Sequence, residues 1–450
     1  MEDQQKLPTL PYELVTQIGS NLCSVEELNS LRALSQLTQT CRALRVTFQP
    51  LLFQSYSHYS QPVSRLVAFL RTIVSRPDLA AAVTTLIFWD PLSSTSLNSI
   101  DKLFIETCIR NIGLSPPAGD WHIEGSNRHI PIEAVLAYTP NIESLTIPVN
   151  EDWALDLLLA FAGASPKMEF PRLRYLSIYY YYISGDHWAI NYGQIQPLLE
   201  ASPHVEHLAL PTLEGFWEDS GNARIPPLKS VTTLDLGESS SGMFFITSII
   251  RACGPLRKFS LCWIRSSGYD ESHEDWNTLE VWDALALVKD TIEEIIFEPT
   301  TEIPLGTPTL KSVSSLSGFT KLRTLKVDGR CLQGMLQAWT LKTGSSDMDD
   351  FVRQLFPSGL HTLAIWSPGS HLIPALLALA KARSNGVYTD LVSVEVGASP
   401  VFKHWLPRPE WSSNEAELRG RFGAAGMELK MEIPYVPPEF LNLALQMGLA

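Results

Sequence analysis

Residues 139–147 read Thr-Pro-Asn-Ile-Glu-Ser-Leu-Thr-Ile, and this stretch decides the fold. Its three apolar residues, Ile142, Leu145 and Ile147, are separated first by two spacers and then by one. An apolar helical run precedes it at residues 132–138, and the proline stops that helix and favours an extended exit. The pattern therefore predicts a helix, a tight turn and a short strand.

The same apolar template recurs along most of the chain. It occurs at Val83-Leu86-Phe88, Ile142-Leu145-Ile147, Leu173-Leu176-Ile178, Val205-Leu208-Leu210, Val231-Leu234-Leu236, Leu256-Phe259-Leu261, Ile292-Ile295-Phe297, Leu322-Leu325-Val327, Leu360-Leu363-Ile365 and Leu391-Val394-Val396. From Ile142 onward, successive starts are 25 to 38 residues apart. One such unit cannot bury its apolar faces alone, whereas stacked neighbours can. The near-periodic order therefore predicts an α/β repeat array.

The N-terminal segment, residues 7–56, has a different pattern of short helices. Pro11 suits the first position of a helix, where its missing N–H costs nothing. One apolar stripe follows at steps of four: Leu14, Ile18 and Leu22. Residues 28–37 form a second helical stretch and residues 41–48 a third, which Pro50 is expected to end. A unit this small and this apolar is expected to place part of its apolar surface against a partner.

Both patterns resemble one family. The residues Leu10-Pro11-Tyr12-Glu13-Leu14, Ile18, Leu22, Leu34, Leu37, Cys41, Arg42, Leu44 and Pro50-Leu51-Leu52-Phe53 resemble the F-box. The strand templates resemble irregular leucine-rich repeats, so the chain is similar to F-box proteins of the divergent fungal type. The resemblance implies a small three-helix F-box at residues 1–56. It also implies an irregular leucine-rich-repeat-like α/β solenoid with a concave parallel sheet at residues 57–450.

The resemblance also implies a function. An F-box binds a Skp-type adaptor, which bridges to a cullin scaffold, and the repeats hold a protein substrate near the ubiquitin-charged enzyme. Such a subunit acts by proximity and orientation and is not itself a catalyst. Two alternatives stay open: a scaffold that binds the adaptor or other proteins without promoting ubiquitination, and an enzyme with an unrecognised site in the loops.

The resemblance and the strand pattern assign two sets of binding residues. By resemblance, the adaptor interface comprises Leu10, Pro11, Leu14, Ile18, Leu34, Leu37, Cys41 and Leu44. Packing among the three helices is the favoured role for Leu22, Leu34 and Leu44. Because strand side chains alternate between faces, the spacers should face outward and meet the substrate. The outward set comprises Tyr175, Tyr179, His207, Asp235, Lys258, Glu294, Lys326 and Trp366.

Composition limits the other functions. The formal net charge of −14 disfavours a general nucleic-acid surface, which needs basic residues. The six cysteines include no Cys-x-x-Cys pair, so a zinc site or a disulfide framework is not expected. No long apolar stretch, signal segment, phosphate-binding loop or nucleophile elbow is present in the sequence, and neither a cofactor nor a membrane is expected. The expected location is the cytoplasm or the nucleus.

Overall fold

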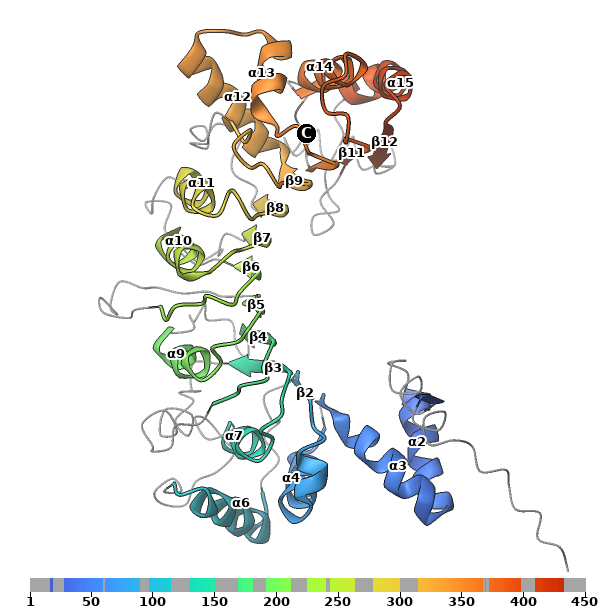
Figure 1. Ribbon diagram of the computed structural model, residues 1–450, viewed down its shortest axis with the longest axis vertical. Coiled ribbons are helices and arrows are strands. Elements are labelled where there is room, and N and C mark those ends of the chain that lie inside the picture. Colours follow the sequence, from blue (N-terminus) through green and yellow to red (C-terminus); the bar gives the residue numbers. More distant parts are fainter. Residues whose placement is uncertain are drawn as a thin grey trace, which may run out of the picture. The chain divides into compact units, whose positions relative to one another are not determined.

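The structure is a computed structural model of the chain (Figure 1). It describes residues 17–18, 28–59, 61–89, 97–114, 129–149, 169–180, 192–211, 225–239, 243–263, 278–299, 315–366, 369, 372–397 and 409–432. The chain divides into two compact units. One comprises Met1–Ser184 with Ile190–Val205, and the other comprises Gly185–Ala189 with Glu206–Ala450.

Parallel strands form the centre of each unit. The first unit holds β1 (Ser55–His58), β2 (Thr85–Phe88), β3 (Ser144–Val149) and β4 (Tyr175–Tyr180), each paired in parallel with the next. The second holds β5 (His207–Ala209), β6 (Thr233–Ser239), β7 (Lys258–Trp263), β8 (Glu294–Pro299), β9 (Thr324–Asp328), β10 (Thr362–Trp366), β11 (Ser393–Gly397) and β12 (Glu428–Glu432), paired in the same way. The predicted α/β class with parallel strands is confirmed.

Helices lie between most successive strands in the described part of the chain, and such crossovers are the usual connection between parallel strands. The first unit holds α2 (Leu28–Thr40), α3 (Arg42–Gln54), α4 (Val63–Ser75), α5 (Pro77–Ala80), α6 (Ser99–Asn111), α7 (Ile130–Ala137) and α9 (Tyr192–Glu200). The second holds α10 (Met243–Ala252), α11 (Thr278–Ala286), α12 (Gly329–Thr343), α13 (Met348–Leu355), α14 (Ile373–Ser384) and α15 (Pro409–Ala424). Within the second unit, α10 and α11 lie on one side of strands β6 to β8 (Figure 1).

A main-chain contact recurs at the start of eight strands. The carbonyl oxygen of the residue before a strand accepts two successive N–H groups from the next repeat. The Glu143 carbonyl, for example, accepts from Arg174 at 2.8 Å and from Tyr175 at 3.0 Å. The same double acceptance occurs at Thr84, Glu206, Thr232, Arg257, Glu293, Arg323 and His361. The repeats are therefore held in register by backbone groups, whatever side chain occupies the position.

The apolar template identifies the buried side of the strands. Every residue of the ten templates is at most 2% exposed. Two further strands, β1 and β12, were not predicted from the sequence. In β1 the third template position holds His58, which is 1% exposed, and in β12 the first holds Gly426, whose φ of 71° ends α15 in a left-handed turn. Because one template position holds a polar residue or a glycine, the apolar pattern does not identify these two strands.

The N-terminal helices continue directly into the first strand. Of the first expected helix only residues 17–18 are described, and both are helical. The prediction that Pro50 ends the third helix is wrong, because α3 runs on to Gln54. Phe53, beyond the proline, stacks on Phe69 of α4 with ring centroids 5.9 Å apart, and this packing favours the continued helix. β1 begins at Ser55, directly after the last residue of α3, so the predicted boundary after residue 56 falls inside β1.

Candidate functional site

The helix pair α2 and α3 forms the first candidate surface. Cys41 adopts an extended conformation before α3, and its Sγ accepts the N–H of Leu44 at 3.5 Å. Leu34 of α2 is fully buried and Phe48 of α3 is 2% exposed, in helices that pack closely together. Burying side chains of this size stabilises the pair by about 1.5–3 kcal/mol each.

The predicted adaptor-contact residues fall into three groups. Leu10, Pro11 and Leu14 lie outside the described residues. Ile18 is 47% exposed, and Cys41 is also exposed. Leu37 and Leu44 are half-buried, whereas Leu34 is completely buried. Leu34 is therefore a packing residue in this structure, and Ile18 and Cys41 have the most accessible side chains among the described members of the set.

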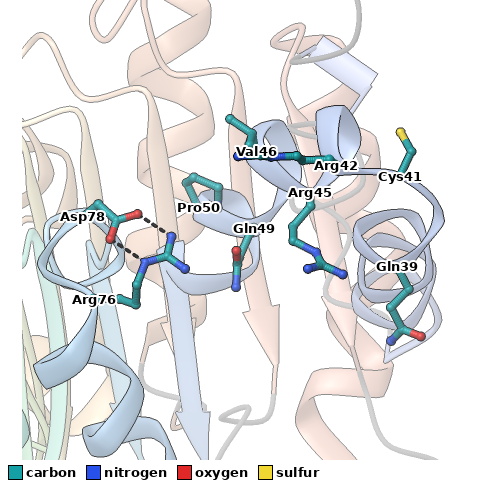
Figure 2. Close-up of a pocket in the computed structure, with 9 residues that line it drawn as sticks. All are labelled: Gln39, Cys41, Arg42, Arg45, Val46, Gln49, Pro50, Arg76 and Asp78. Atoms are coloured by element: carbon teal, nitrogen blue, oxygen red, sulfur yellow. Dashed lines mark hydrogen bonds and ion pairs between the residues drawn. The ribbon is translucent and has the colours of Figure 1, made fainter.

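A pocket of about 500 Å³ lies beside α3 (Figure 2). It is lined by Gln39, Cys41, Arg42, Arg45, Val46, Gln49, Pro50, Arg76 and Asp78. These residues come from the end of α2, from α3 and from the turn into α5. The lining combines three guanidinium groups and one carboxylate with the short apolar wall of Val46 and Pro50.

The charged groups of the pocket differ in their pairing. Arg76 donates from Nε and Nη2 to the two carboxylate oxygens of Asp78, at 2.8 and 2.6 Å. This pairing holds the pKa of the Asp78 carboxyl below its usual value. Arg45 donates from Nε to the carbonyl of Thr38 at 3.1 Å, and neither Arg42 nor Arg45 is paired with a carboxylate in the described residues. Positive charge is therefore left over on the α3 side.

The outward face of the second unit forms another candidate surface, and it is charged. The strand register aligns His207, Thr233, Lys258 and Glu294 across β5 to β8. Lys258 Nζ lies 3.2 Å from Glu294 Oε2. Burial lowers the pKa of His207, and the Lys258 ammonium lowers it further, while the Asp235 carboxyl acts in the opposite direction. The predicted residues on these strands thus do share one face.

Among the described strand positions, the outward face of the first unit is uncharged. Its strand positions hold Ser55, Ser57, Thr85, Ile87, Ser144, Thr146, Tyr175, Ser177 and Tyr179. The Tyr179 hydroxyl donates to the Phe88 carbonyl at 2.5 Å, and its ring lies 5.8 Å from that of Trp89, which is 48% exposed. Tyr175 and Tyr179 are half-buried. The two units therefore offer partners different chemistry.

The predicted alternation fails at the ends of several strands. Trp366 was predicted to contact a substrate from the outward face, but its side chain is only 6% exposed, so little of it is accessible to a partner. In β10 the last four residues are all buried, which means that both faces of the strand end are covered. Among the other predicted substrate contacts, Lys258 is exposed, and His207, Asp235, Glu294 and Lys326 are half-buried.

Other kinds of site find no support among the described residues. No group of three or more His, Cys, Asp or Glu side chains in that part of the chain could hold a metal ion. Burial raises the pKa of the Cys108 thiol to about 11, so this thiol stays protonated at neutral pH and is a poor nucleophile. Within the same described ranges, no helix is both long enough and apolar enough to span a bilayer.

No protein-family model matches the chain, and no curated protein does. Apart from Cys41, which was predicted as an adaptor contact, the pocket residues were missed as site residues in the sequence, because Arg42 and Arg45 are some 30 residues from Arg76 and Asp78. Trp89 was missed because it follows β2 at an outward position beyond the template. Extending the strand template by one residue beyond Phe88 would have assigned Trp89 to the outward face, and no other sequence signal points to it.

Proposed function

We propose that the chain is the substrate-recognition subunit of a Skp–cullin–F-box ubiquitin ligase. In this proposal the N-terminal helices are an F-box that docks a Skp-type adaptor, and the strand repeats are a divergent leucine-rich-repeat-like domain that holds a protein substrate. One observation carries the proposal: α3 ends at Gln54 and β1 begins at Ser55, so a helix pair is joined to a stack of parallel repeats without a linker.

The direct connection suits a proximity mechanism. A receptor accelerates ubiquitin transfer by presenting its substrate in a fixed position, and a flexible joint would lose part of that gain. The stacking of Phe53 and Tyr56 on Phe69 fixes the joint, with ring centroids 5.9 and 4.0 Å apart. The outward strand faces, one uncharged and one charged, are where a substrate is proposed to bind.

The adaptor contact is tested by pulldown with a purified Skp-type adaptor. Ile18 is 47% exposed, and we expect Ile18→Asp to reduce adaptor recovery at least tenfold, because it places a charge in an apolar interface. Leu341→Asp is the matched control, since Leu341 is 87% exposed on α12 in the other unit. Equal recovery with Ile18→Asp and the unaltered chain would contradict the F-box assignment.

Cullin recovery separates a ligase receptor from a scaffold. A receptor brings down a cullin together with the adaptor, and its partners accumulate when the proteasome is inhibited. A scaffold that binds the adaptor alone retains its partners at unchanged abundance. Recovery of the adaptor without a cullin would therefore support the F-box assignment and contradict the assignment as a ubiquitin-ligase subunit.

A further inference from the structure

The pocket beside α3 carries more positive than negative charge on its described lining residues. Its lining holds the guanidinium groups of Arg42, Arg45 and Arg76 against the single carboxylate of Asp78. Figure 2 shows Arg76 and Asp78 joined on one side of the pocket and Arg42 and Arg45 on α3 on the other. The chain has 48 acidic and 34 basic residues, so a local cationic excess goes against its composition.

Arginines elsewhere in the chain illustrate the contrast. Arg71 pairs with Asp101 at 2.7 Å, and Arg257 pairs with Glu293 at 2.6 Å. One exposed unpaired arginine is ordinary, because solvent stabilises its charge. Two unpaired arginines that line a concave surface with an excess of positive charge are different, because such a surface strengthens the electrostatic attraction of an approaching anion.

The start of α3 adds a second source of positive potential. The helix begins at Arg42, next to the pocket residue Cys41, and its N–H groups carry partial positive charge there. No acidic residue lies in the first turn of α3 to offset it. The N–H of Leu44 is weakly satisfied by a thiol sulfur at 3.5 Å, which is a poorer acceptor than a carboxylate.

We propose that this pocket binds an acidic peptide segment of a protein partner, with Arg42 and Arg45 as the anchoring cations. Guanidinium groups donate paired hydrogen bonds to carboxylates, and Gln39 and Gln49 can bind the main chain of the same segment. Val46, which is 69% exposed, and Pro50 supply an apolar wall for a neighbouring side chain. The pocket borders the proposed adaptor surface, because Cys41 belongs to both, but its anchoring residues Arg42 and Arg45 are not among the proposed adaptor or substrate contacts. The proposal does not depend on the chain joining a ubiquitin ligase.

The test measures binding of a fluorescein-labelled hexaglutamate peptide to the full chain by fluorescence anisotropy. We expect saturable binding that weakens as salt is raised. The double variant Arg42→Ala with Arg45→Ala should weaken binding about tenfold. Arg32→Ala is the matched control, because Arg32 is an exposed arginine on α2 outside the pocket, and it should bind like the unaltered chain.

A variant that is expected to bind more tightly distinguishes a change at the pocket from a loss of binding caused by misfolding. Asp78→Asn removes the one carboxylate among the described lining residues and releases Arg76 from its ion pair, so we expect tighter binding of hexaglutamate. An equal loss with Arg32→Ala, or equal binding of a glycine–serine peptide of the same length, would overturn the proposal. Binding of a phosphoserine peptide in the absence of hexaglutamate binding would also overturn it, in favour of a phosphate site.

Discussion

Gly254 occupies a position where the neighbouring main chain leaves no room for a side chain. A Cβ added there would lie 2.1 Å from the Lys229 carbonyl oxygen and 2.8 Å from its carbon. Gly254→Ala should therefore lower the free energy of unfolding by about 1–3 kcal/mol, because backbone must move. Urea denaturation of the variant and the unaltered chain measures the difference.

Gly423 provides the control for that substitution. It lies in α15 with no atom within 4 Å of its added Cβ. Gly423→Ala should raise stability by up to about 1 kcal/mol, because alanine is the better helix former. A similar loss of stability in both variants would mean that crowding at Lys229 is not the cause.

Tyr388 has a left-handed backbone conformation and a buried hydroxyl group. Its φ is 57°, its side chain is 2% exposed, and its hydroxyl donates to the carbonyls of Val352 and Phe356. Burial raises the pKa of Tyr388 to about 12. Because the folded chain holds this proton more tightly than the unfolded chain, the contribution is complete below about pH 10 and is lost as the pH rises toward 12.

Tyr388→Phe tests both parts of that account. At neutral pH the variant should be less stable by about 1 kcal/mol, because two carbonyls lose a donor. Between pH 10 and 12 its stability should fall less steeply than that of the unaltered chain. Parallel pH profiles of the two proteins would assign the alkaline loss to other tyrosines.

Single residues also explain which strands the sequence reveals. Ten strands were predictable because all three template positions hold apolar residues that are buried. His58 and Gly426 each break one template, and β1 and β12 were missed for that reason. A buried histidine satisfies the packing of a strand but looks polar in the sequence, and Tyr56 helps to accommodate it with a hydroxyl 3.3 Å from Nδ1.

At the scale of elements, α3 contains a proline at its interior. Pro50 has no N–H to donate to the carbonyl four residues earlier, which weakens the helix. Pro50→Ala should therefore stabilise α3 and slow amide hydrogen exchange there by about tenfold or more. Mass spectrometry of peptides covering residues 42–54 measures the effect.

Pro77 is the matching control, because it occupies the first turn of α5, where a proline costs little. Pro77→Ala should leave hydrogen exchange unchanged or slightly faster. Faster exchange in α3 after Pro50→Ala would show that the proline ring stabilises this element through its packing.

The strands also show how far the alternation of side chains between two faces can predict exposure. The period of two predicts which face a side chain takes, and it placed Lys258 and Glu294 together on the outward face. It does not predict whether that face is covered, and Trp366 is buried at the end of β10 for this reason. The pocket was beyond prediction because its residues come from α2, α3 and the start of α5, which packing alone brings together.

At the scale of the whole molecule, the two compact units should unfold separately. Stability in a repeat array is approximately a sum of contributions from neighbouring repeats. Each of the two compact units should therefore keep most of its stability when the other unfolds. We expect two calorimetric transitions. Leu66→Ala, at a fully buried position of α4, should lower the first unit's transition alone, and Gly254→Ala should lower that of the second.

A fragment of residues 206–450 extends this test. It should retain the circular dichroism of a folded α/β protein and melt near the second unit's transition in the full chain. A single transition in the full chain that both substitutions shift equally would mean that the units fold as one cooperative block.

The carbonyl that receives two N–H groups before eight of the strands has an evolutionary consequence. The contact uses only main-chain atoms, and the position accordingly holds threonine, glutamate, arginine or histidine in different repeats. Substitutions can accumulate there, and at the outward strand positions, while each repeat keeps its place beside the next. Sequence similarity between relatives built on this contact will fade well before their architecture does.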